Sequence, residues 1–305
     1  MQSLQSLEEV LGSMEYPGRF LSVGRSPTEE YDTALIYSIT GRSPDSQSRE
    51  LVEGENTGVV RTKVTDPEVL KKGSEALLVY PAIIPVTAGA SNYVVASNGY
   101  QTNLLHTALV NLTNFVGELN KKEHNKFEKT VIESALSNPH LIYDQQNDRV
   151  IDVTTYEPDP SHTPRISLVA STERACLHIV RCGKDEQKEP AYHPFDLSGF
   201  KEGEGRFIST YDGINQDPLQ SFEGEPLEVK LPGKTPEQTA HAVYEALAPE
   251  QGKLDLRVGV VCVYFKKERI SEVFTELHYK ISIINRTKNK QDQINKSFTP
   301  ITPDY

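Results

Sequence analysis

The chain has 305 residues, of which 37% are hydrophobic and 25% charged, a composition typical of folded globular proteins. Its 32 Lys and Arg residues against 43 Asp and Glu give a net charge of −11, and the absence of a dense basic stripe argues against general nucleic-acid binding. Three cysteines without a Cys-x-x-Cys spacing argue against a disulfide framework or a zinc site. The chain lacks both a secretory signal pattern and a run of about 18 apolar residues, so we expect a cytoplasmic protein that does not span a membrane.

The first half of the chain has the pattern of several strands followed by two helices. A short amphipathic segment with Leu7 and Leu11 comes first. Runs rich in Val, Ile and Tyr, bounded by Gly, Pro and Asn, then predict strands at 18–24, 33–40, 59–64, 76–86 and 92–97. Apolar residues three and four apart predict one helix from 104 to 119 and another from 127 to 136.

The second half alternates strands with one further helix. Strands are predicted at 166–171, 175–182, 207–211, 256–265 and 277–284. Thr235 as N-cap and Pro236 at the first helical position predict a helix that runs to about Leu247. The segments 183–194 and 215–234 are rich in Pro, Gly and charge, which favours surface loops or insertions.

This order of elements predicts an α+β fold, since it lacks the regular alternation of a doubly wound parallel sheet. It favours a four-layer α/β/β/α sandwich, in which two mixed or antiparallel sheets stack face to face with helices outside. We expect residues 1–15 to form an N-terminal extension and 16–284 a single domain with insertions near 183–204 and 215–234. Residues 285–305 are expected to form a polar C-terminal tail.

The same tetrapeptide occurs at the ends of two neighbouring predicted strands, and each copy contains an arginine. Gly-Arg-Ser-Pro occurs at 24–27 and again at 41–44, so that Arg25 and Arg42 each stand where a strand ends. Arginines so placed can hold one phosphate or carboxylate through paired hydrogen bonds. Two hairpin turns with solvent-exposed arginines explain the same pattern equally well.

Two further clusters combine polar residues with strand ends. The first cluster is Asn98-Gly99, a turn that connects a strand to the long helix, with Thr102 as a candidate cap. The first residues of such a helix are able to bind an anion. A plain turn and cap is the alternative. Glu157, between Tyr156 and Pro158, precedes a strand and is a candidate for proton transfer, or else a loop acid that pairs with Arg165. His162 is expected at the surface.

No Gly-x-Ser-x-Gly elbow and no His-Glu-x-x-His pattern occurs, so a standard triad or a catalytic zinc finds no support in the sequence. Proton-transfer chemistry without a metal is the interpretation that the remaining clusters favour.

Taken in order, the clusters resemble the archaeal-type, stand-alone inosine monophosphate cyclohydrolase family. The matching residues are Tyr16, Gly18, Arg19, 23–25, Arg42, Ser43, 94–99, Thr102, Tyr156, Glu157, Asp159, 163–166 and 208–211. No single motif is specific, but their order and spacing agree over roughly 16–211. The resemblance implies a fold similar to that of N-terminal-nucleophile hydrolases, without a terminal nucleophile.

The resemblance also implies an activity and its site. The family closes the purine ring of a formamido-imidazole carboxamide ribonucleotide with loss of water, without a cofactor or a metal, and the resemblance suggests a homo-oligomer. The candidate catalytic residues are Glu157, Tyr80 and Arg42. The candidate substrate-binding residues are Arg19, Arg25, Ser43, Arg49, Asn98, Gly99, Thr102, Tyr156, Thr163 and Arg165.

One departure from the family leaves two other functions open. The family carries a second Tyr shortly after the one that matches Tyr80, and here that place is held by Ile83. A purine-nucleotide-binding protein without catalytic activity is therefore one alternative. An amidohydrolase that acts on a related amide is the other, since similar folds support amide chemistry.

Overall fold

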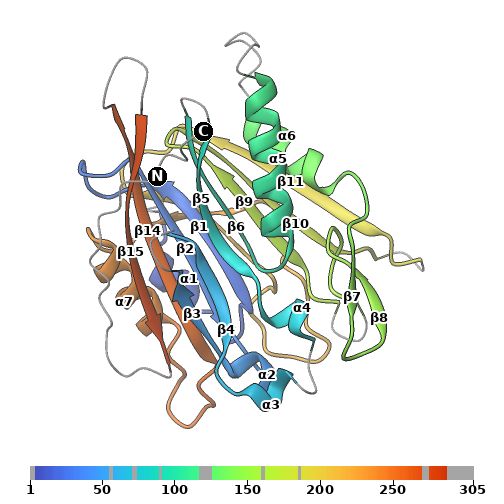
Figure 1. The fold of residues 1–305 in the computed structure, drawn as a ribbon. Coiled ribbons are helices and arrows are strands. Elements are labelled where there is room, and N and C mark those ends of the chain that lie inside the picture. The colour runs from blue at the N-terminus through green and yellow to red at the C-terminus, as the bar shows by residue number, and fades with distance from the viewer. Residues whose placement is uncertain are drawn as a thin grey trace.

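Two large antiparallel sheets run through the computed structural model of the chain (Figure 1). The structure describes residues 4–54, 58–70, 74–88, 91–116, 126–158, 162–184, 187–269 and 275–286. The predicted C-terminal tail from 287 onward, Asp159 and the end of the first long helix lie outside these ranges.

The first sheet has six strands in the order β13-β12-β1-β2-β14-β15. Their bounds are β1 Arg19–Arg25, β2 Thr33–Thr40, β12 Glu204–Ser209, β13 Leu227–Lys230, β14 Arg257–Arg269 and β15 Thr275–Asn285. β1 and β2 are buried along almost their whole length, and apolar residues face both sides of the sheet in each strand.

The second sheet has seven strands in the order β11-β10-β9-β6-β5-β4-β3. Their bounds are β3 Arg49–Glu53, β4 Val60–Val64, β5 Pro81–Ala88, β6 Ser91–Ser97, β9 Arg165–Ala170, β10 Arg174–Cys182 and β11 Pro190–Ser198. A separate hairpin, β7 Leu141–Asp144 with β8 Arg149–Asp152, projects beside it (Figure 1).

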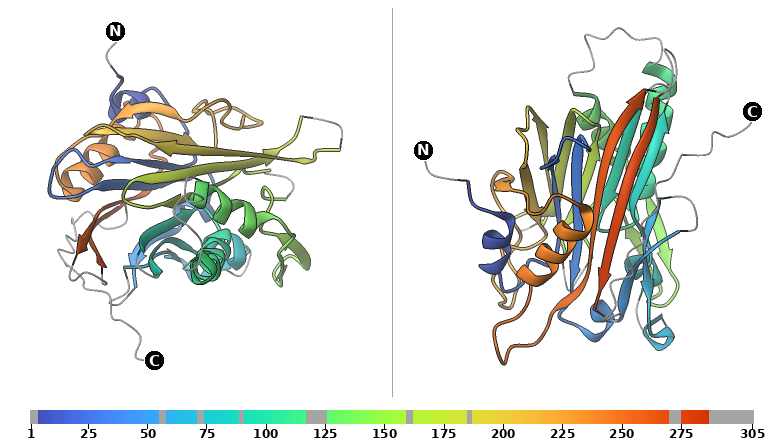
Figure 2. Two further views of the ribbon diagram at one scale, coloured as in Figure 1. Left: turned by 90° about the horizontal axis from the view of Figure 1, so that it is seen from above. Right: turned by 90° about the vertical axis from the view of Figure 1, so that its left-hand side faces the viewer.

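Within the described ranges, four helices lie outside the sheets and three helical turns lie in loops. α1 Leu7–Gly12 and α7 Pro236–Ala246 lie on one side of the molecule, and α5 Gln101–Val116 and α6 Phe127–Leu136 on the other (Figure 2). The short turns are α2 Pro44–Gln47, α3 Pro67–Leu70 and α4 Glu75–Leu78. α7 begins as the sequence predicts, with the Thr235 side chain accepting from the N–H of Gln238 and proline in the first turn.

Three apolar cores hold these elements together. The first joins residues of both sheets, among them Leu35, Ile83 and Leu168. The second packs α1 and α7 on the six-stranded sheet, and the third packs α5 and α6 on the seven-stranded sheet. The coarse prediction of a mixed α and β chain with antiparallel sheets is therefore confirmed.

Several predicted elements need correction. The predicted strand 76–86 begins with the helical turn α4, and only its later part belongs to β5. The predicted loop 183–194 contains the start of β11, and 215–234 contains β13. β3, β7 and β8 were not predicted. Among the described residues, no helix is both long and apolar enough to cross a membrane.

Candidate functional site

The ends of several strands from both sheets meet at one edge of the molecule. β1 begins there and β2 ends there, since Arg19 pairs with Ile39 and the N–H of Thr40 donates to the carbonyl of Gly18. In the other sheet β6 ends and β9 begins at this edge, where Ser97 pairs with Ser167. Residues far apart in the sequence are therefore brought together at this edge.

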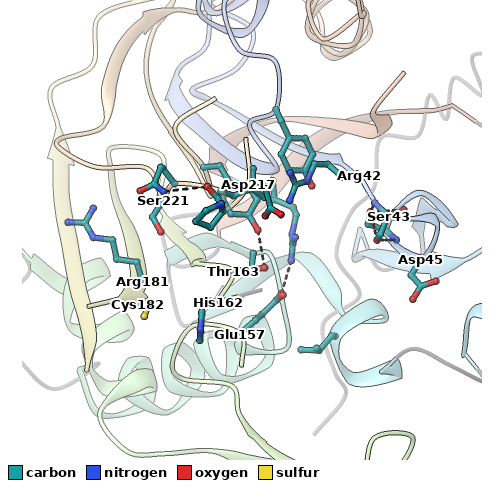
Figure 3. Close-up of a pocket in the computed structure, with 18 of the residues that line it drawn as sticks. Arg42, Ser43, Asp45, Glu157, His162, Thr163, Arg181, Cys182, Asp217 and Ser221 are labelled. Carbon is teal, nitrogen blue, oxygen red and sulfur yellow. Dashed lines mark hydrogen bonds and ion pairs between the residues drawn. The ribbon is translucent and has the colours of Figure 1, made fainter. Parts of the chain in front are cut away.

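A cavity of about 740 Å³ opens at this edge, a size within the usual range for small-molecule sites. The described part of its wall contains six Arg or Lys side chains and four Asp or Glu side chains. Figure 3 shows Arg42 and Ser43 on one side of Glu157, with Arg181 and Cys182 on the other. An acidic chain has thus placed an excess of positive charge around one cavity.

Glu157 forms an ion pair with Arg19 in the wall of this cavity. The Arg19 Nη2 lies 2.7 Å from the Glu157 Oε1, and both side chains are about nine-tenths buried. Burial works against the charge on Arg19, yet the ion pair with Glu157 and nearby tyrosines raise its pKa above the ordinary value. The backbone N–H of Glu157 donates to the carbonyl of Thr163, which holds the loop closed.

Two stacked tyrosines stand beside this pair. The rings of Tyr16 and Tyr211 lie 5.6 Å apart, and both line the cavity. The Tyr211 hydroxyl donates to the Thr163 hydroxyl at 3.0 Å (Figure 3). Burial raises the pKa of Tyr211 to about 12, against the opposing charge of Arg19, so the phenol keeps its proton at neutral pH.

Arg42 and Arg49 stand at one end of the cavity. Arg42 lies over the Tyr16 ring and donates to the carbonyl of Gln216 at 3.0 Å. Arg49 is buried at the start of β3 and donates through its Nε to the carbonyl of Ser46 at 3.1 Å. Among the described residues, no carboxylate lies within ion-pair distance of either guanidinium. Both are therefore able to bind an anion.

Ser43 and Thr163, two predicted substrate-binding residues, also line the cavity. Ser43 caps α2 in a capping box with Ser46, so its hydroxyl is already engaged within the loop. His162, predicted at the surface, is half-buried and belongs to the wall. Tyr156 lies outside the described wall, and its hydroxyl donates to the carbonyl of Lys188.

Asn98, Gly99 and Thr102 are buried behind the cavity, outside its described wall. The Asn98 side chain donates to the carbonyl of Pro164 and accepts from the N–H of Ile166. Thr102 donates to the carbonyl of Gly99. These polar groups join the turn to β9, which leaves little capacity for the predicted phosphate contact. Arg165 is buried against this turn.

Tyr80 and Ile83 lie in the core between the sheets. Tyr80 is 1% exposed, and its hydroxyl hydrogen-bonds to that of Tyr37 at 3.0 Å. Tyr80 is among the groups that raise the pKa of Arg19, which places it near the site, although it is not in the described wall of the cavity. Ile83 pairs with Ala96 inside the same core.

Arg25 is not part of this site. Because β1 and β2 are antiparallel, their final residues lie at opposite ends of the pair, and Arg25 pairs in register with Thr33. Six residues of strand, about 20 Å at 3.3 Å per residue, separate it from Arg19. Arg25 instead forms an ion pair with Asp32 at 3.0 Å beside a different pocket. The predicted convergence of the two Gly-Arg-Ser-Pro arginines is wrong for this reason.

Several residues of the site were missed by the predicted set. Tyr16 and Tyr211 occur in the matched motifs, but nothing in the sequence indicates that their rings stack. Gln101 lies two residues after Gly99, and only the structure shows that it accepts from Arg165. Arg149, Arg181 and Lys184 also line the cavity, from segments that carry no local signal.

Comparison with known proteins adds a family to this geometry. The family model described as IMP cyclohydrolase-like protein matches residues 144–255. This segment contains Glu157, Thr163, Arg165 and Tyr211, whereas Arg19, Arg42 and Arg49 lie before it. No curated protein matches the chain. The resemblance predicted from the sequence is confirmed over this segment.

Proposed function

We propose that this chain, whose residues 144–255 belong to the IMP cyclohydrolase-like family, is an inosine monophosphate cyclohydrolase. The reaction is closure of the purine ring of 5-formamido-1-(5-phosphoribosyl)imidazole-4-carboxamide. One observation carries the proposal: Glu157 lies in a cavity wall between arginines, and in the described part of the chain only Arg19 pairs with it. That arrangement supplies one group for proton transfer and cationic anchors for one phosphate.

The chemistry requires positioning and movement of protons. The carboxamide nitrogen attacks the formyl carbon, forming a C–N bond while negative charge develops on the formyl oxygen. The proton lost by the nitrogen passes to Glu157, which then delivers it to the oxygen to form a hydroxyl and returns to its carboxylate form. That hydroxyl leaves as water after a second proton, which the other ring nitrogen gives up. Holding both groups of one molecule in contact supplies much of the rate.

In this proposal Arg42 and Arg49 bind the 5′-phosphate. Neither has a carboxylate partner among the described residues, and both line the same end of the cavity. Ser43 and Thr163 contribute hydroxyls to the wall. Tyr211 keeps its proton at neutral pH, and in this proposal its phenol exchanges the hydrogen bond to Thr163 for one to the oxygen that gains charge.

The fold, the cellular location and the oligomeric state are part of the same proposal. The three cores, one between the sheets and one beneath each pair of helices, support an α/β/β/α arrangement like that of N-terminal-nucleophile hydrolases. A metabolic reaction on a phosphorylated intermediate suits a cytoplasmic enzyme. The homo-oligomer suggested by the resemblance stays a prediction.

A non-catalytic nucleotide-binding protein is the second candidate. It is favoured by the position of Tyr80, whose hydroxyl is buried against Tyr37, and by Ile83 within the core. Such a protein would keep the arginines and bind inosine monophosphate without closing the ring of the precursor.

The first prediction concerns Glu157→Gln. We expect turnover of the formamido precursor, followed by ultraviolet absorbance, to fall about a hundredfold or more, because the proton acceptor is lost. Binding of inosine monophosphate should stay within a few-fold, since the glutamine oxygen still accepts from Arg19. Glu128→Gln, at a buried glutamate outside the cavity, is the matched control and should keep full activity.

Retention of activity in Glu157→Gln would remove Glu157 from the mechanism. Binding of inosine monophosphate without turnover in the unaltered protein would favour the second candidate. Release of ammonia from the precursor would instead indicate an amidohydrolase.

A further inference from the structure

Arg165 is a buried cation with few partners. Its side chain is 2% exposed, and its Nη1 donates to the Gln101 Oε1 at 3.3 Å. Its Nε and Nη2 are buried, and neither has a hydrogen-bond partner among the described residues. Buried charged groups are ordinarily paired with an opposite charge, because an unpaired one carries a large desolvation cost. Here the direct acceptor is a neutral amide.

The charge of Arg165 acts on the pair at the centre of the cavity. Burial lowers the pKa of Arg165, the carboxylate of Glu157 opposes that effect, and the charge of Arg19 adds to it. Arg165 comes two residues after Thr163, whose carbonyl accepts from the N–H of Glu157, so the chain brings a second guanidinium close to this carboxylate. Arg19 holds the direct ion pair with it at 2.7 Å. The cluster of the three side chains carries one positive charge in excess.

The turn before α5 holds Arg165 in this place. A Cβ atom on Gly99 would overlap the Arg165 Nη1 and the Gln101 Oε1, so a larger residue there would displace this pair. The Gln101 amide accepts from Arg165 and donates to the Asn98 Oδ1 at 3.2 Å. Asn98 in turn accepts from the N–H of Ile166, the residue next to Arg165. The turn and the strand are thereby joined on both sides of Arg165.

We propose that Gln101 is a positioning residue that holds Arg165 behind Glu157 without neutralising its charge. This inference rests on the proposed function. As Glu157 takes up the proton, its negative charge is lost while negative charge develops on the formyl oxygen in the cavity. Arg19 and Arg165 then stabilise that oxygen together across a low-dielectric interior, without Arg165 touching the substrate. A neutral amide at 101 is required because a carboxylate would cancel this field.

The experiment compares Gln101→Glu with Gln101→Met in the full chain. We expect the glutamate variant to lose about tenfold or more in kcat and to change KM by less than about twofold. The methionine variant loses every hydrogen bond of the Gln101 side chain, yet should lose less kcat because Arg165 keeps its charge. Its melting temperature should be no higher than that of the glutamate variant, which still accepts from Arg165.

The glutamate variant should therefore have the lower kcat but a melting temperature equal to or higher than that of the methionine variant. If the role of Gln101 were only structural, kcat and melting temperature would fall together. Gln238→Glu, at an exposed position on α7 whose Oε1 accepts from the N–H of Lys234, should change neither quantity. Equal kcat in the two variants, or a lower kcat for methionine, overturns the inference alone. Absence of turnover in the unaltered protein overturns the proposed function and this inference with it.

Discussion

Arg42 and Arg25 occupy the same place in a repeated tetrapeptide, yet they lie at opposite ends of the β1–β2 pair. Arg42 lines the cavity and has no carboxylate within ion-pair distance among the described residues. Arg25 is paired with Asp32. The two residues thus form a natural comparison between an arginine available for an anion and one that is engaged.

We expect Arg42→Ala to raise KM and to weaken binding of inosine monophosphate about tenfold or more, with a smaller change in kcat. A charge-assisted contact to a non-reacting phosphate stabilises ground and transition states alike. Steady-state kinetics and calorimetry measure the two quantities, with Arg25→Ala as the control that should change neither. Equal effects of the two substitutions would exclude Arg42 as a phosphate ligand.

His178 on β10 makes stability depend on pH. Burial, with a smaller effect of His193, lowers the pKa of His178 to about 3. The unfolded chain takes up this proton near pH 6.5, so below that pH the unfolded state binds more protons than the folded state. The contribution of His178 to stability is therefore full above about pH 6.5 and is lost as the pH falls toward 3.

Between pH 7.5 and 5 this histidine alone should lower the free energy of unfolding by about 2 kcal/mol, since one pKa unit corresponds to about 1.4 kcal/mol. Urea unfolding at both pH values measures the loss. Between the two pH values, the free energy of unfolding of His178→Gln should fall by about 2 kcal/mol less than that of the unaltered protein. His241→Gln, at an exposed position on α7, should show the same fall as the unaltered protein. An unchanged pH dependence in His178→Gln would contradict the burial argument.

At the scale of elements, α1 is an integral layer although the sequence predicts residues 1–15 to be an extension. Ser6 and Glu9 form a reciprocal capping box at its start. Leu7 and Leu11 are fully buried in the core that α1 shares with α7 and the six-stranded sheet. The segment before β1 therefore covers apolar surface that would otherwise be exposed.

Leu11→Ala should lower the free energy of unfolding by about 2 to 5 kcal/mol, the usual range for emptying a buried leucine site. Chemical denaturation measures it, and Leu254→Ala, at a side chain that is 66% exposed, should change stability little. A negligible effect of Leu11→Ala would mean that α1 contributes nothing to the stability of the fold.

The sequence predicted most accurately the elements in which buried residues follow a regular pattern along the chain. β2 and α6 have the predicted bounds, because the first has a mostly apolar, fully buried sequence and the second has a clear helical spacing. β11 was predicted as loop because it contains Pro190 and Pro194. The structure places β11 at the edge of its sheet, where a proline does not interrupt pairing on both sides.

At the scale of the whole molecule, the cavity is assembled from the ends of strands in two sheets. Arg19 and Arg42 come from the six-stranded sheet or its loops, whereas Arg49 and the loop with Glu157 belong with the seven-stranded sheet. Among the described residues, the acidic chain places six cationic side chains around this cavity. The division into extension, single domain with insertions and tail stays a prediction, although α1 packs on the core.

The sequence by itself determined the mixed α and β content, most strand and helix positions, and the candidate residues of one local motif, Glu157 with its neighbours. These depend on residue spacing and turn chemistry within short segments. Whether the sheets were antiparallel was left open by the sequence and decided by the structure. Only the tertiary structure decided which arginines meet, because antiparallel pairing sends Arg25 away from Arg42. It also placed Gln101 against Arg165 and Tyr211 beside Thr163, contacts across 64 and 48 residues of chain that local patterns do not encode.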